Sequence, residues 1–119
     1  MHYQTDSYDK YLKVIATGEY SFQQLFPFIE YMKSETERLG AKFLLVDCSE
    51  VQGHIPEVDR FEGGQKMAEV FGPLTQIALI LAPGTVTKMG ELAAVNRGAR
   101  LLVTDDPAEA VRWLSARGD

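Results

Sequence analysis

The spacing of apolar and polar residues along the chain predicts four units in which a strand is followed by a helix. Side chains in 11–17 alternate between apolar and polar, which is typical of a strand with one buried face and favours a place at the sheet edge. The runs 42–47 and 76–82 are almost continuously apolar and predict central strands covered on both faces. The segment 100–104 predicts the fourth strand.

The first predicted helix begins after Ser21, because Ser21 and Gln24 have the spacing of a capping box. Pro27 lies too far along to be the first helical residue, so either the first turn is separate or the helix bends there. Phe28 and Tyr31 fall beside the apolar stripe, so the helix is covered on two sides or meets a partner. The stripe that we expect to face the core consists of Phe22, Leu25, Phe26, Ile29, Met32 and Leu39.

The second predicted helix, 57–71, contains a pair of glycines, Gly63 and Gly64. Each mid-helix glycine costs about 1 kcal/mol relative to alanine, so the pair predicts either a break or the close approach of another backbone. A third helix is expected over 86–97, and a fourth over 108–117. The residues of the second helix that we expect to point inward are Val58, Phe61, Ala68 and Phe71.

The start of the last helix is the best marked in the chain. Asp106 has the position of an N-cap, Pro107 that of the first helical residue, and Glu109 lies three residues after the cap. Repeated strand–helix units within 119 residues, of which 45% are hydrophobic, predict one α/β domain, 1–119, with a mainly parallel sheet and right-handed crossovers.

Composition narrows the function classes. The formal net charge of −5 and the scattered Lys and Arg residues argue against nucleic acid or an anionic membrane as a partner. No apolar run approaches the roughly 20 residues that span a bilayer, and the first residues lack a basic start with an apolar segment, so we expect a cytoplasmic protein without membrane insertion. The single Cys48 excludes a disulfide framework and is interpreted as a small buried hydrophobic residue.

The residue types of a catalytic triad occur at Asp47, Cys48 or Ser49, and His54. They lie within one predicted loop and lack the glycine pattern of a nucleophile elbow, and ordinary loop capping by Asp and Ser explains them equally well. His2 and His54 lack partners at metal-ligand spacing. We therefore expect neither hydrolysis by a triad nor a bound metal or cofactor.

The loop 47–56 follows a central strand, at the end of a parallel sheet where ligands and partners are usually bound. A solvated connection is the simpler interpretation of the same residues.

The order of segments resembles the STAS fold and, more narrowly, the bacterial SpoIIAA-like family, whose architecture is shared with CRAL-TRIO lipid carriers. Three stretches carry the resemblance: Thr-Gly-Glu at 17–19, Leu-Val-Asp-Cys-Ser-Glu-Val at 45–51, and the sequence from Leu101 to Leu114. The resemblance implies a mixed, mostly parallel sheet of four to five strands with about four helices, in which 3–8 adds a short edge strand. It also implies a non-enzymatic role with a protein partner.

STAS-type antagonists are switched by phosphorylation of a serine at the start of the second helix. In this chain that stretch falls on 54–57, which has no hydroxyl residue, so the resemblance predicts a module without the phosphoserine switch. Ser49 is the nearest hydroxyl.

Two functions follow as hypotheses. The first is an interaction or regulatory module that binds a protein partner, or a second copy of itself, through an exposed, charge-tolerant surface. That surface would comprise the loop from Cys48 and the start of the second helix, with partner-binding residues Ser49, His54, Glu57, Asp59 and Arg60.

The alternative is a carrier or sensor of a small apolar, lipid-like ligand. The side chains expected to bind it lie beside the glycine pair: Phe61, Met67 and Phe71. A closed apolar pocket would favour this alternative, whereas a filled core with an exposed patch would favour the interaction module.

Overall fold

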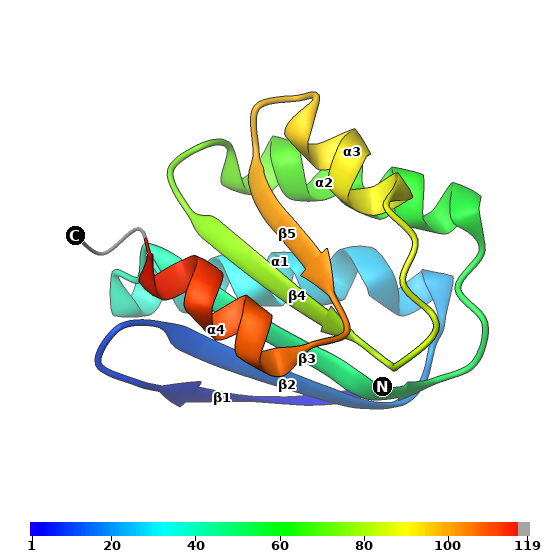
Figure 1. Ribbon diagram of the computed structural model, residues 1–119, viewed down its shortest axis with the longest axis horizontal. Helices are drawn as coiled ribbons and strands as arrows, with labels where there is room; N and C mark the ends of the chain where they lie inside the picture. The colour runs from blue at the N-terminus through cyan, green and yellow to red at the C-terminus, as the bar shows by residue number, and fades with distance from the viewer. Residues whose placement is uncertain (117–119) are drawn as a thin grey trace.

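Five strands lie in the sheet in the same order as in the sequence (Figure 1). β1 is antiparallel to β2, and β2 to β5 are parallel to one another. This computed structural model describes residues 1–116, and it confirms the predicted α/β class, the mixed sheet and the N-terminal edge strand. The elements are β1 (His2–Ser7), β2 (Leu12–Glu19), α1 (Phe22–Leu39), β3 (Phe43–Gln52), α2 (Glu57–Phe71), β4 (Gln76–Leu81), α3 (Met89–Val95), β5 (Arg100–Thr104) and α4 (Pro107–Ser115).

The helices form two layers, one on each face of the sheet. Parallel strands that follow one another in a single direction, joined by right-handed crossovers, place their connecting helices on one face. α1 and α2 lie on that face, which we call the inner face, and α3 packs against α2 and β5. α4 returns to the opposite, outer face and packs on β3, β4 and β5 (Figure 1).

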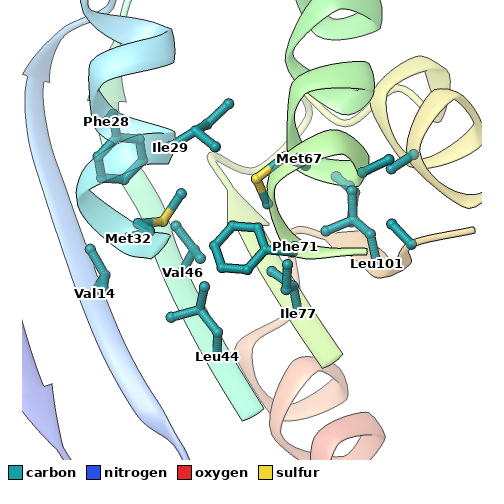
Figure 2. Packing of buried hydrophobic residues seen from close by; sticks show 14 of the residues in the cluster. Val14, Phe28, Ile29, Met32, Leu44, Val46, Met67, Phe71, Ile77 and Leu101 are labelled. Atoms are coloured by element: carbon teal, nitrogen blue, oxygen red, sulfur yellow. The ribbon is translucent and has the colours of Figure 1, made fainter. Parts of the chain in front are cut away.

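The larger core lies between the inner face and the helices α1 and α2. Figure 2 shows side chains of both helices meeting those of β2, β3 and β4. A smaller core beneath α4 contains Leu45, Ala78, Ile80, Ala110 and Leu114. β3 and β4 therefore have buried side chains on both faces, as their continuous apolar runs predict.

The predicted edge position of the strand 11–17 is wrong. Leu12, Val14 and Ala16 are buried, as the alternation predicts, but β1 pairs with β2 and takes the edge. The alternation arises because α4 covers β3 to β5 and leaves the outer face of β2 without a helix.

α1 is one continuous helix through Pro27, so the separate first turn is not found. The capping box is also wrong, because Ser21 makes no side-chain cap bond and the Gln24 side chain instead accepts a hydrogen bond from the amino group of Met1. Phe28 lies in the core rather than beside it.

The apolar face of α1 is rotated relative to the predicted stripe. Phe22 and Leu39 are exposed, whereas the ring centroids of Phe28 and Tyr31 lie 4.9 and 4.7 Å from that of Tyr3 on β1. β1 extends the sheet beneath α1, and this extra strand gives the helix a second surface to cover.

α2 is unbroken, and the close approach of α3 explains Gly64. A Cβ at Gly64 would lie 2.3 Å from the carbonyl oxygen of Gly90. Because the glycines face neighbouring helices, Val58 and Phe61 point outward, and the prediction that these two point inward is wrong.

The third helix is shorter than predicted, and the fourth begins one residue earlier. α3 covers Met89–Val95 rather than 86–97. α4 begins at Pro107, with the Asp106 side chain accepting a hydrogen bond from the Ala108 amide, which confirms the predicted N-cap. The predicted end of α4 at position 117 lies outside the described residues.

A candidate ligand cavity

A cavity of 120 Å³ lies between the inner face of the sheet and the helices α1 and α2. Its walls are almost entirely apolar. Figure 2 shows two of its lining residues, Ile29 on α1 and Met67 on α2, projecting into the space between the two helices. The sheet side of the lining includes Val46, Cys48, Leu79, Leu101 and Val103.

The cavity explains why two residues in the middle of the sheet are only partly buried. Leu79 lies on β4 between two hydrogen-bonded strands, and Cys48 lies on β3 in the same setting. Both line the cavity, whereas Ala78 and Ile80, on the opposite face of β4, are closed off beneath α4. Solvent-sized space therefore reaches Leu79 and Cys48 from the inner face.

The glycine pair of α2 shapes the cavity. Gly64 allows α3 to approach, and Gly63 lies in the cavity wall without contributing a side chain. A Cβ at Gly63 would lie 3.3 Å from Cδ2 of Leu25, another lining residue. Gly63 therefore lets the end of the Leu25 side chain lie close against the α2 backbone in the cavity wall.

One end of the cavity, which we call its outer end, lies at the carboxyl ends of the parallel strands. It is bounded by residues that follow these strands. Tyr20 follows β2, Ile55 follows β3 and Thr87 follows β4. The Tyr20 hydroxyl donates a hydrogen bond to Oδ2 of Asp59 at 2.8 Å. Burial raises the pKa of Tyr20, and the hydrogen bond to the Asp59 carboxylate raises it further, so the phenol stays neutral.

Arg60 on α2 donates hydrogen bonds to the connections after β3 and β4, which bound the outer end of the cavity. Its Nε donates to the Ile55 carbonyl at 2.9 Å, and its Nη1 donates to the Thr85 carbonyl at 2.8 Å and to Oγ1 of Thr87 at 3.3 Å. Oε1 of Glu57 lies 3.6 Å from Nε and accepts a hydrogen bond from Thr87 at 2.6 Å. The Arg60 side chain is 11% exposed, so this polar cluster is built into the structure.

The predicted partner-binding residues do not form one free surface. Ser49 lies on β3 and donates from its amide and its hydroxyl to Oδ1 of Asp47. His54 is exposed in the connection after β3, and Glu57 is exposed at the start of α2. The expectation that Asp59 and Arg60 lie on an exposed surface is wrong for Arg60, which is largely buried, and Asp59 accepts a hydrogen bond from Tyr20.

The structure also shows what the residues of the candidate triad contact. Asp47 binds Ser49 directly, in the manner of a local turn, rather than orienting a histidine. Cys48 lines the cavity, where burial raises the pKa of its thiol to about 12 and the Asp47 carboxylate adds to the shift. A thiol with that pKa is a poor nucleophile at neutral pH.

Of the three side chains predicted to bind an apolar ligand, Met67 lines the cavity. Phe71 is buried in the larger core but is not part of the cavity lining. Phe61 is 38% exposed on the outside of α2, where the Arg97 guanidinium carbon lies 5.7 Å from its ring centroid. Phe61 therefore lies outside the cavity, because α2 turns its glycines inward.

Sequence reasoning missed several lining residues, including Tyr20, Leu25 and Thr87. They come from segments far apart in the chain, and nothing in their local pattern distinguishes them from ordinary core or loop residues. The glycine pair was the one signal, because an unexplained glycine within a helix indicates that something approaches or that space is kept open.

Within the described part of the chain, no group of three His, Cys, Asp or Glu side chains is arranged to hold a metal ion. None of the helices described in residues 1–116 combines the length and the apolar character needed to cross a membrane. The sequence matches no known family model, and no curated protein is significantly similar to it. Arguments about function therefore rest on the site itself.

Proposed function

We propose that the protein binds a small apolar ligand in the cavity between the inner face of the sheet and the helices α1 and α2, and acts as its carrier or sensor. The observation that carries this proposal is a 120 Å³ space with almost purely apolar walls between the sheet and the helices α1 and α2. An engineered apolar cavity of about 150 Å³ stays free of water and binds benzene or xenon, so a space of this size suits an apolar guest.

The energetic cost of the cavity supports a functional reason for it. Enclosed cavities cost about 24 cal/mol per Å³, so 120 Å³ sets an upper limit of about 3 kcal/mol on the lost stability. A typical domain is stable by about 5–15 kcal/mol, so this loss is a large share of the total. A bound apolar ligand would recover part of it.

The position of the cavity supports the same proposal. Its outer end lies where β2, β3 and β4 reach their carboxyl ends, which is where open parallel sheets usually bind ligands. Arg60 holds the connections after β3 and β4 in place around this end. The site is therefore already formed in the ligand-free structure.

Thermal unfolding with and without benzene tests the proposal. Benzene at ten times its dissociation constant should stabilise the folded protein by about 1.4 kcal/mol and raise Tm by about 5 °C. Leu79→Phe, which extends a ring into the cavity, should abolish the rise. Leu102→Phe is the matched control, because Leu102 pairs with Ala78 and lies on the opposite face of the neighbouring strand.

A rise in the wild type and the Leu102→Phe protein, but not in the Leu79→Phe protein, supports binding in the cavity. An unchanged Tm in wild-type protein at saturating benzene contradicts it. An equal rise in all three proteins would place the binding elsewhere.

A second candidate function is the STAS-like interaction module, and exposed apolar side chains favour it. α3 buries Ala93 and Ala94 and leaves Met89, Leu92 and Val95 in solvent, which reverses the usual arrangement of a surface helix. Val58 and Phe61 are likewise exposed on α2, which packs against α3. Exposed apolar residues gathered on two adjoining helices are typical of a protein-binding surface.

Leu92→Lys combined with Val95→Lys tests this second candidate. Both side chains are about half exposed, at 55% and 47%, so the double variant should keep the wild-type Tm within about 2 °C. Affinity purification from the host should then lose any partner that wild-type protein retains. Retention of every partner by the double variant would exclude this face.

A further inference from the structure

We infer that the ligand is uncharged and no larger than a single six-membered ring, and that Gly63 sets this limit. The inference rests on the proposed function and narrows it. It replaces the expected lipid-like ligand with a compact one.

The size follows from the volume. The cavity measures 120 Å³, somewhat less than the roughly 150 Å³ that holds benzene in an engineered protein. Leu79 and Cys48 bound the space on the sheet side, and Ile29 and Met67 bound it on the helix side. A second ring or a long acyl chain would have to displace these side chains from a packed core, and overpacked cores are disfavoured.

The inference that the ligand is uncharged follows from the hydrogen bonds that the polar groups at the outer end of the cavity already make. The Arg60 guanidinium donates to the carbonyls of Ile55 and Thr85, and the Glu57 carboxylate lies 3.6 Å from it. The Asp59 carboxylate accepts the Tyr20 hydroxyl. Both charged side chains that border the cavity therefore already have hydrogen-bond partners within the protein. A charged ligand would lose its hydration among apolar walls, at a cost that these groups are not free to offset.

Gly63 sets the limit on ligand size. It is a glycine in the cavity wall, and no close backbone contact requires a glycine there. Gly64 is required by the carbonyl of Gly90, 2.3 Å from where its Cβ would lie. At Gly63 the nearest atom to a Cβ would be the end of the Leu25 side chain, at 3.3 Å. A methyl group there would push Leu25, which also lines the cavity, into the ligand space.

Titration calorimetry at pH 7 with benzene, benzoate and naphthalene tests the inference on wild-type, Gly63→Ala and Leu25→Ala proteins. Wild-type protein should bind benzene at least tenfold more tightly than benzoate or naphthalene. Gly63→Ala should weaken benzene binding at least tenfold while its ligand-free Tm stays within about 4 °C of wild type. Leu25→Ala, which enlarges the same region, should bind naphthalene at least fivefold more tightly than wild type.

The possible failures are distinguishable. Absence of binding by all three compounds would overturn the proposed function itself. Equal or tighter binding of naphthalene or benzoate by wild-type protein would overturn the inferred size or charge and leave the proposed function standing. Wild-type benzene affinity in Gly63→Ala would overturn the role of Gly63. If Gly63→Ala does not fold, Leu25→Ala decides, and unchanged naphthalene affinity would count against a size limit at this position.

Discussion

Replacing Gly64 by alanine should separate two helices that the fold holds in backbone contact. The added Cβ would lie 2.3 Å from the Gly90 carbonyl oxygen and 3.0 Å from Cβ of Ala93. A comfortable carbon–oxygen contact is about 3.3–3.6 Å, so α2 and α3 must move apart by about 1 Å. Neither obstacle can rotate away, because one is main chain and the other is a Cβ.

The magnitude combines two opposing effects. Overpacking costs about 1–3 kcal/mol, and the absence of a movable side chain places this case at the upper end. The higher helix propensity of alanine than of glycine stabilises the variant by about 1 kcal/mol. The free energy of unfolding should therefore fall by about 2 kcal/mol, which lowers Tm by about 8 °C for a domain of this size.

Gly63→Ala is the matched control, because it makes the same change one residue earlier in α2. Its Cβ would meet the end of the Leu25 side chain at 3.3 Å, and that side chain is half-buried and free to adjust. The free energy of unfolding should stay within about 1 kcal/mol of wild type. Urea unfolding followed by far-UV circular dichroism measures both variants, with unchanged m-values showing that the same surface is exposed. Equal stability of Gly64→Ala and Gly63→Ala would refute the backbone contact as the reason for Gly64.

Three further predictions concern single side chains. Asp106→Ala removes the acceptor for the Ala108 amide and should cost about 1 kcal/mol, or about 4 °C in Tm, so an unchanged melting curve would show that this cap does not stabilise α4. Arg60→Met leaves the carbonyls that Arg60 binds without their donors and should lower the free energy of unfolding by about 2–3 kcal/mol; an unaltered urea midpoint would contradict this. Because the pKa of Cys48 is raised to about 12, its thiolate fraction at pH 8 is about a thousandfold below that of an ordinary cysteine, and alkylation by iodoacetamide should slow by a similar factor relative to the urea-unfolded chain. Comparable alkylation rates in the two states would show that the thiol is accessible and ionised.

The strands themselves could be predicted because the evidence for each is local. Alternation in β2 and the apolar runs of β3 and β4 reflect which faces each strand buries, and the Asp106 cap requires only adjacent residues. The orientation of the helices depended on distant segments. Phe28 is buried because β1 widens the sheet beneath α1, and nothing within α1 encodes that strand.

The candidate site was predictable only in outline. The glycine pair pointed to an unusual place in α2, and Met67 beside it does line the cavity. Phe61 was misplaced because aromatic residues are usually buried, whereas α2 orients itself by fitting Gly64 against Gly90. A cavity is a property of several elements packed together, so its volume is absent from any single stretch of sequence.

The methionine methyl groups can test the central claim that the cavity binds an apolar ligand. Of its four methionines, Met1, Met32 and Met67 line the cavity, and Met89 lies outside it on the exposed side of α3. Methyl NMR of protein labelled with ¹³C at the methionine methyl groups, titrated with benzene, observes all four at once. Saturable shifts of the Met32 and Met67 signals with an unmoved Met89 signal are the predicted result. Absence of saturable shifts at Met32 and Met67, or equal shifts at Met89, would contradict ligand binding in the cavity.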